Sequence, residues 1–131
     1  MTRILMITAD TQLCATLRAI LERAHYEVVA AQNGREGLER YQEAAAVVSI
    51  VDMLLPEQEG LETIITLHRV DPQVKIIALS GSGQMGRRDV LRFTALLGVQ
   101  RTLQQPVRLP ELIEAVLDLT QGKNAGMCPA L

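Results

Sequence analysis

Aromatic side chains are scarce in this sequence, whose 131 residues include two Tyr, one Phe and no Trp. A surface on which bases or sugars stack needs several exposed rings, so this kind of binding site is not expected. Cysteine is equally scarce: Cys14 and Cys128 are too few for a disulfide framework or a zinc site. We therefore expect both to be reduced thiols.

The sequence also lacks an excess of charge of one sign, and it lacks long apolar runs. A net charge of −2 and a pI near 5.7 argue against direct binding to nucleic acid or to a membrane surface. No apolar run approaches the roughly 18 residues of a membrane span, and the amino terminus does not resemble a signal peptide. We expect a cytoplasmic protein with one globular core.

Short apolar runs alternate with helical periodicity five times along the chain. The runs predict strands buried on both faces, at residues 4–7, 28–31, 47–51, 74–80 and 99–103. Each is followed by apolar residues at helical spacing, including a fourth helix over 90–97. The pattern predicts a mostly parallel sheet with helices on both faces and right-handed crossovers. Residues 1–120 form the expected domain, and residues 121–131, which have no periodicity, a flexible tail.

Local signals mark where several of these elements begin. Asn33 and Glu36 have the spacing of a capping box, and Pro110 suits the first position of the last helix. The fifth strand has the weakest pattern, because Gln100 and its two neighbours dilute its apolar character.

Polar residues stand at the carboxyl ends of four predicted strands. Because those ends meet at one edge of a parallel sheet, we expect Thr8, Asp52, Ser80 and Gln105 to be neighbours. Asp52 ends the third apolar run, and the loop after it contains Pro56, which fixes φ, and Gly60, which admits positive φ.

This arrangement resembles the receiver domain of two-component response regulators over residues 3–120. The resemblance is carried by five residues at the expected separations: Asp52, Pro56, Gly60, Ser80 and Pro106. The start of the last helix, at 107–112, also resembles that of a receiver domain. It implies the flavodoxin-like receiver fold, a doubly wound five-stranded parallel sheet in the order 2-1-3-4-5 with five helices. The proteins of this family are signalling domains, and at most phosphoacceptors rather than enzymes.

The resemblance implies a role for Asp52 and also marks where this chain departs from the family. An aspartate at this position accepts a phosphoryl group from a histidine kinase with the help of Mg²⁺, and a Ser or Thr at the Ser80 position donates a hydrogen bond. Two acids after the first strand hold the metal, a Lys pairs with the phosphate, and an aromatic residue in the fifth strand changes rotamer. Here Thr8 and Ala9, Gln105 and Thr102 stand at those positions.

These replacements predict a weakened metal site. Mg²⁺ requires oxygen ligands in octahedral geometry, and the remaining candidates are Asp52, Asp10 and the backbone carbonyl of Leu54. Asp10 stands one residue beyond the acid pair, and its alternative role is to cap the helix that begins near Thr11. Gln105 offers a neutral amide in place of a positive charge.

We therefore keep three functions open. The first is an atypical receiver-like domain in a phosphorelay, with weak or absent Mg²⁺-dependent phosphorylation of Asp52, acting through contacts with other proteins. The second is an ordinary phosphoacceptor modified by a histidine kinase. The third is a small flavodoxin-like protein that binds a nucleotide or a flavin, for which the only phosphate-loop signal is the short Gly-rich segment 81–83.

The expected partners are a histidine kinase or another signalling protein. The resemblance assigns dimerisation and output contacts to the fourth helix, fifth strand and fifth helix, where five arginines occur: Arg87, Arg88, Arg92, Arg101 and Arg108. A basic surface for a homodimer or an output partner is one interpretation, and a solvated face with balanced charges is the other.

Overall fold

The computed structural model describes residues 2–53, 59–80 and 98–121. Its five strands are parallel and lie in the order β2-β1-β3-β4-β5. They comprise β1 (Thr2–Ile7), β2 (Tyr26–Ala31), β3 (Val48–Asp52), β4 (Ile76–Ser80) and β5 (Arg101–Gln104). The described helices are α1 (Thr11–Arg23), α2 (Gly34–Glu43), α3 (Glu59–Val70) and α5 (Leu109–Thr120).

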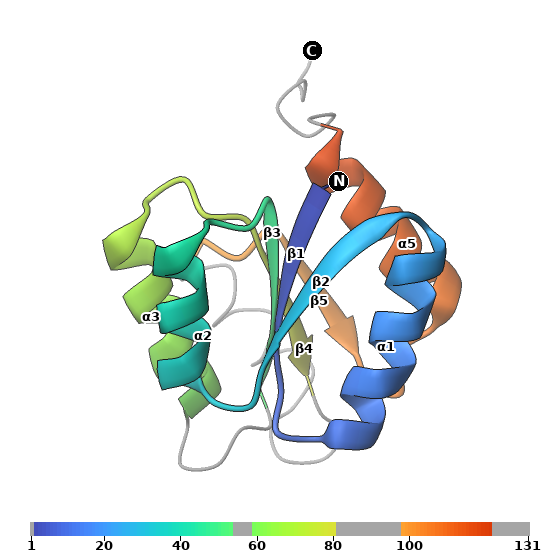
Figure 1. Ribbon diagram of the computed structural model, residues 1–131, viewed down its shortest axis with the longest axis horizontal. Helices are drawn as coiled ribbons and strands as arrows, with labels where there is room; N and C mark the ends of the chain where they lie inside the picture. The colour runs from blue at the N-terminus through green and yellow to red at the C-terminus, as the bar shows by residue number, and fades with distance from the viewer. Residues whose placement is uncertain (1, 54–58, 81–97, 122–131) are drawn as a thin grey trace.

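Helices cover both faces of the sheet, with α1 and α5 on one side and α2 and α3 on the other (Figure 1). The predicted fold class and strand order are confirmed. The fourth predicted helix lies outside the described residues, as does the predicted tail apart from Gln121.

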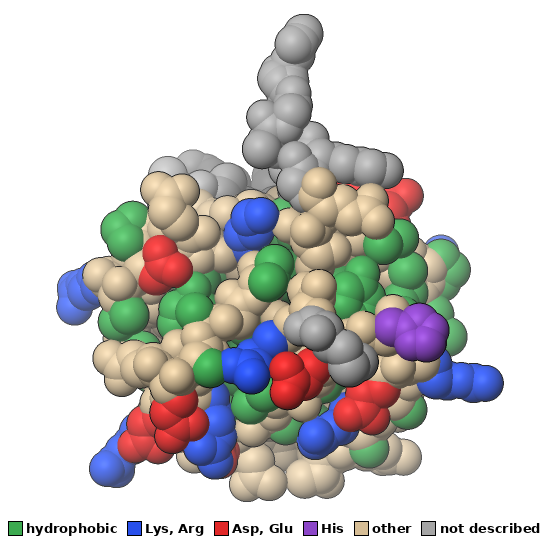
Figure 2. All heavy atoms as spheres, turned by 45° about the horizontal axis from the view of Figure 1, so that its top comes forward, with side chains coloured by type: hydrophobic (Ala, Val, Ile, Leu, Met, Phe, Trp, Pro, Cys, Tyr) green, Lys and Arg blue, Asp and Glu red, His purple; other side chains and the backbone are tan. Residues whose placement is uncertain are grey.

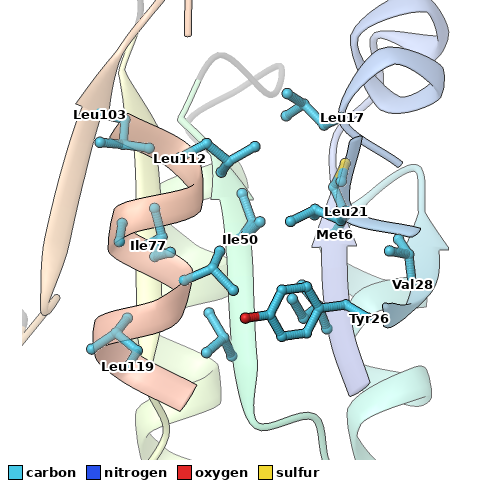
Figure 3. Close-up of a cluster of buried hydrophobic side chains, with 14 of the residues drawn as sticks. Met6, Leu17, Leu21, Tyr26, Val28, Ile50, Ile77, Leu103, Leu112 and Leu119 are labelled. Carbon is cyan, nitrogen blue, oxygen red and sulfur yellow. The ribbon is translucent and has the colours of Figure 1, made fainter. Parts of the chain in front are cut away.

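Each face of the sheet has its own hydrophobic core. Ile50 and Ile77 pack against α1 and α5 through Leu17, Leu21 and Leu112 (Figure 3). The other core contains side chains of α2 and α3 together with the alternate residues of the strands: Leu5, Ile7, Val51, Tyr41, Ile64 and Leu67. All five residues of β3 and of β4 are buried, as the continuous apolar runs predicted. Full burial of each Val, Ile or Leu side chain among them stabilises the fold by about 1.5–3 kcal/mol.

The fifth strand begins later than predicted, at Arg101, and the structure explains its polar residues. The side chain of Gln100 accepts a hydrogen bond from the Ile76 backbone N–H (2.8 Å), and the backbone N–H of Gln100 donates to the Ile76 carbonyl (3.2 Å). Arg101 forms an ion pair with Asp118 of α5. Polar side chains thus complete the hydrogen bonding at the edge of the sheet, where an apolar run is not required.

The predicted helix starts are largely confirmed. The Asn33 side chain accepts from the Glu36 N–H (2.8 Å), although the Glu36 carboxylate bonds to the N–H of Gln32 and not to that of Asn33 itself. Helix α5 begins at Leu109, so Pro110 is its second residue and not the first. Proline is tolerated there because the N–H groups of the first turn have no partner within the helix.

Candidate functional site

Four strand ends bring polar residues together at the carboxyl edge of the sheet, the edge at which β1 leads into α1 (Figure 1). Asp52 is the last residue of β3, Ser80 the last of β4, and Thr8 and Gln105 follow β1 and β5. Asp52 is paired in register with Leu79, which places it beside the end of β4. The predicted convergence of these residues is confirmed by the contacts below.

Both carboxylate oxygens of Asp52 accept hydrogen bonds from neutral side chains. The Thr8 hydroxyl donates to Oδ2 at 2.7 Å, and the Gln105 amide Nε2 donates to Oδ1 at 3.2 Å. Asp52 is only 4% exposed and Thr8 only 2%. The 2.7 Å contact from Thr8 is of ordinary length for a hydrogen bond between a hydroxyl group and an oxygen acceptor.

The Thr8 hydroxyl also connects Asp52 to the start of α1. Its oxygen accepts from the backbone N–H of Asp10 at 3.1 Å. The Asp10 carboxylate in turn accepts from the N–H groups of Gln12 and Leu13, both at 3.0 Å, which confirms Asp10 as the N-cap of α1. Its alternative role as a metal ligand stays a prediction.

Ser80 is buried, and its hydroxyl lies 3.5 Å from the carbonyl of Leu103 in β5, at the long limit of a hydrogen bond. Its backbone carbonyl accepts from the N–H of Gln105 at 2.8 Å. This second contact, which the sequence pattern did not indicate, holds the backbone of Gln105 next to the site. Ala9 is exposed, and Leu54 lies outside the described residues.

Gly60 is needed for close packing and not for a positive φ, so the sequence-based reason was wrong. It is the second residue of α3. A Cβ at this position would lie 2.7 Å from the Asp52 carbonyl oxygen and 2.9 Å from Cα of Met53. The absent side chain therefore lets the start of α3 approach the backbone that carries Asp52.

Two of the five arginines expected on the output face are described. Arg101 is engaged in its ion pair with Asp118, whereas Arg108 is exposed at the N-cap of α5. Arg87, Arg88 and Arg92 lie outside the described residues.

On the face in Figure 2, acidic and basic side chains lie beside one another. Among the described helices, none has the length and hydropathy needed to cross a bilayer.

The fold and the buried aspartate at this edge define a receiver-type signalling domain. The chain belongs to the response regulator receiver domain family, whose family model matches residues 4–117. Members of this family are domains of two-component systems, which interact with histidine kinases and other signalling proteins and are not enzymes in the usual sense.

Relatives and solved structures agree with this assignment. The chain is 35% identical to the chemotaxis protein CheY of Thermotoga maritima over 83 residues, which cover 63% of this chain and 69% of that protein. It is 26% identical to CheY of Bacillus subtilis over 115 residues, covering 87% and 93%. A CheY-like receiver domain from Methanospirillum hungatei superposes with a TM-score of 0.84 at 26% identity, covering 95% of this chain and 98% of that one.

Receiver domains generally bind Mg²⁺ at an acidic pocket, and at the positions of the acid pair this chain has Thr8 and Ala9. Mg²⁺ prefers one or two carboxylates and several further oxygens in octahedral geometry. In this chain the Asp52 oxygens receive hydrogen bonds from Thr8 and Gln105, and the side chain of Ala9 has no donor atom at all. Within residues 2–53, 59–80 and 98–121, no three His, Cys, Asp or Glu residues are grouped so as to hold a metal.

Proposed function

We propose that this chain is an atypical receiver-like signalling domain, in which Mg²⁺-dependent phosphorylation of Asp52 is weak or absent. It acts through protein–protein contacts within a two-component pathway. The observation that carries this proposal is the pair of neutral donors, Thr8 and Gln105, on the two oxygens of Asp52.

The two side chains that bond to Asp52 are neutral, and this gives a physical reason for slow phosphoryl transfer. A phosphoryl group brings negative charge that a metal ion and a Lys ordinarily balance, and a hydroxyl and an amide carry no charge. Removal of one preorganised electrostatic stabiliser typically raises a transition state by about 3 kcal/mol. Loss of both lowers the rate by several orders of magnitude, although such effects do not simply add.

The direct test is incubation of the purified chain with an acyl phosphate or with beryllofluoride and low millimolar Mg²⁺, followed by intact mass spectrometry. We expect a small fraction of modified protein. Stoichiometric modification that is lost in Asp52→Asn would contradict the proposal.

The retained Asp52 and Ser80 favour the second candidate, an ordinary phosphoacceptor. Both are buried at the carboxyl ends of neighbouring strands, as a phosphoacceptor and its hydrogen-bonding partner would be. This candidate requires signalling to depend on the acid. If so, Asp52→Asn abolishes signalling in the cell, whereas the atypical domain that we propose tolerates the substitution.

The partner that we propose is a histidine kinase or another signalling protein, with a homodimer through α5 and β5 as the further possibility. Arg108 is exposed there and Leu109 is 49% exposed, so a basic and an apolar side chain are adjacent. Sedimentation velocity over a range of protein concentrations tests the homodimer. Self-association should weaken in Arg108→Glu, and a monomer at every concentration would exclude it.

A further inference from the structure

A continuous set of hydrogen bonds leads from Asp52 to the first turn of α1. Asp52 Oδ2 accepts from the Thr8 hydroxyl, the same hydroxyl oxygen accepts from the Asp10 N–H, and the Asp10 side chain accepts from the N–H groups of Gln12 and Leu13. The middle residue, Thr8, is 2% exposed. The burial excludes water that would otherwise compete for the bond between Thr8 and Asp52, whereas the bonds to the Asp10 side chain are exposed.

The geometry toward β5 is poorer. The Ser80 hydroxyl lies 3.5 Å from the Leu103 carbonyl, compared with 2.7 Å and 3.1 Å for the two bonds of Thr8. In addition, Thr102 stands in β5 where an aromatic residue would offer a large side chain with two rotamers. Asp52 itself accepts from the Gln105 amide, just after β5, at 3.2 Å in a part-buried contact, whereas its bond from Thr8 is buried and 2.7 Å long. Of these two bonds, the shorter and more buried one leads toward α1.

We propose that a change in the Asp52 side chain alters the local stability of the first turn of α1. Thr8 is the positioning residue that couples the two. The inference rests on the proposed function, because it requires a neutral hydroxyl at the position of Thr8. The first turn of α1 is accessible to a partner protein, since Thr11 and Gln12 are both exposed. The affinity of a partner that binds this turn would therefore depend on whether the Asp52 carboxylate holds Thr8 in place.

Because the amide of Gln105 can act as donor or acceptor, the coupling should survive Asp52→Asn and be lost in Asp52→Ala. The substitution Asp52→Asn would keep an oxygen for the Thr8 hydroxyl, and Gln105 can rotate its amide so that its oxygen accepts from the new NH₂ group. The substitution Asp52→Ala removes the acceptor altogether. The Thr8 side chain is then no longer fixed. Its hydroxyl oxygen, which accepts from the Asp10 N–H, is free to move as well.

The test is amide hydrogen exchange measured by NMR on the full chain without metal or phosphodonor. In Asp52→Ala, we expect the Asp10 amide to exchange about tenfold faster, equivalent to about 1.4 kcal/mol of local opening. In Asp52→Asn and in Ser80→Ala, the Asp10 amide should exchange within about twofold of the wild-type rate. Equal Asp10 exchange in Asp52→Ala and wild type would overturn the inference, as would uniform acceleration across β1 and α1.

A second pair of variants decides the matter if Asp52→Ala does not fold. Because coupling is reciprocal, a weakened helix cap must also change the environment of the Asp52 carboxylate. Asp10→Ala should shift the ¹³Cγ resonance of Asp52, whereas Asp10→Asn, an equally good cap, should leave it in place. No shift in either variant would overturn the inference. No step of these experiments involves phosphorylation, so a failure of this inference can be distinguished from a failure of the proposed function.

Discussion

Thr8 contributes to stability as well as to the site, because its hydroxyl bonds both to the buried Asp52 carboxylate and to the Asp10 N–H. Thr8→Val keeps the shape but leaves one carboxylate oxygen and one N–H without this partner. We expect the free energy of unfolding in urea to fall by about 2 kcal/mol. Thr8→Ser, which keeps the hydroxyl, is the control and should lose far less. Equal stability of Thr8→Val and wild type would show that water replaces these bonds.

Ser49 presents the opposite case at the residue scale. It lies in the middle of β3, is 0% exposed, and within the described part of the chain its hydroxyl has no hydrogen-bond partner. Because a buried hydroxyl without a partner is destabilising, Ser49→Ala should raise the free energy of unfolding by about 1 kcal/mol.

The matched control for Ser49→Ala is Ser80→Ala, where the hydroxyl faces an acceptor at the long limit of a hydrogen bond. Chemical denaturation of the three proteins side by side makes the comparison. A loss of stability in Ser49→Ala comparable to that in Ser80→Ala would contradict the account of Ser49.

At the scale of elements, a tyrosine joins α2 to the end of α3. The hydroxyl of Tyr41, which is buried against the second core, donates to the Asp71 carboxylate at 2.6 Å. Burial raises the pKa of Tyr41 above its ordinary value of 10.0, and the hydrogen bond and negative charge of Asp71 raise this pKa further. The same hydrogen bond lowers the pKa of Asp71.

This pKa shift predicts a loss of stability in alkali. Folding favours the protonated form of Tyr41, so its contribution is complete below pH 10 and declines above it, where the tyrosine of the unfolded chain ionises first. Tyr41→Phe removes this contribution. The variant loses the hydrogen bond to Asp71, so it should be less stable than wild type at pH 7. Because it has no hydroxyl that titrates, it should also lose less stability between pH 8 and pH 11, as measured by urea unfolding. Parallel pH profiles would contradict the assignment.

Elements were predictable where one local interaction decides the backbone. The side chains of Asn33 and Asp10 cap the helices that their positions indicated. The start of β5 was not predictable, because the Gln100 side chain bonds to β4, a partner distant in sequence. The reason for Gly60 was missed for the same cause: its constraint is the Asp52 backbone, which only the folded chain brings near.

At the scale of the whole molecule, the scaffold and the site chemistry are separable. The two hydrophobic cores involve none of the polar residues at the carboxyl edge, so substitutions around Asp52 need not alter the packing of the fold. The strand ends were enough to predict that Thr8, Asp52, Ser80 and Gln105 converge. The direction of each hydrogen bond was not predictable, because it depends on rotamers and loop positions that strand order does not specify.

The central claim is that neutral side chains at Thr8, Ala9 and Gln105 suppress phosphorylation of an otherwise intact receiver fold. The most direct measurement compares wild type with the triple variant Thr8→Asp, Ala9→Asp, Gln105→Lys in the fraction of Asp52 phosphorylated by an acyl phosphate at low millimolar Mg²⁺. We expect little labelling of wild type and a gain of at least about a hundredfold in the initial rate for a folded triple variant. Rapid, stoichiometric labelling of wild type, or no gain in the triple variant, would contradict the claim.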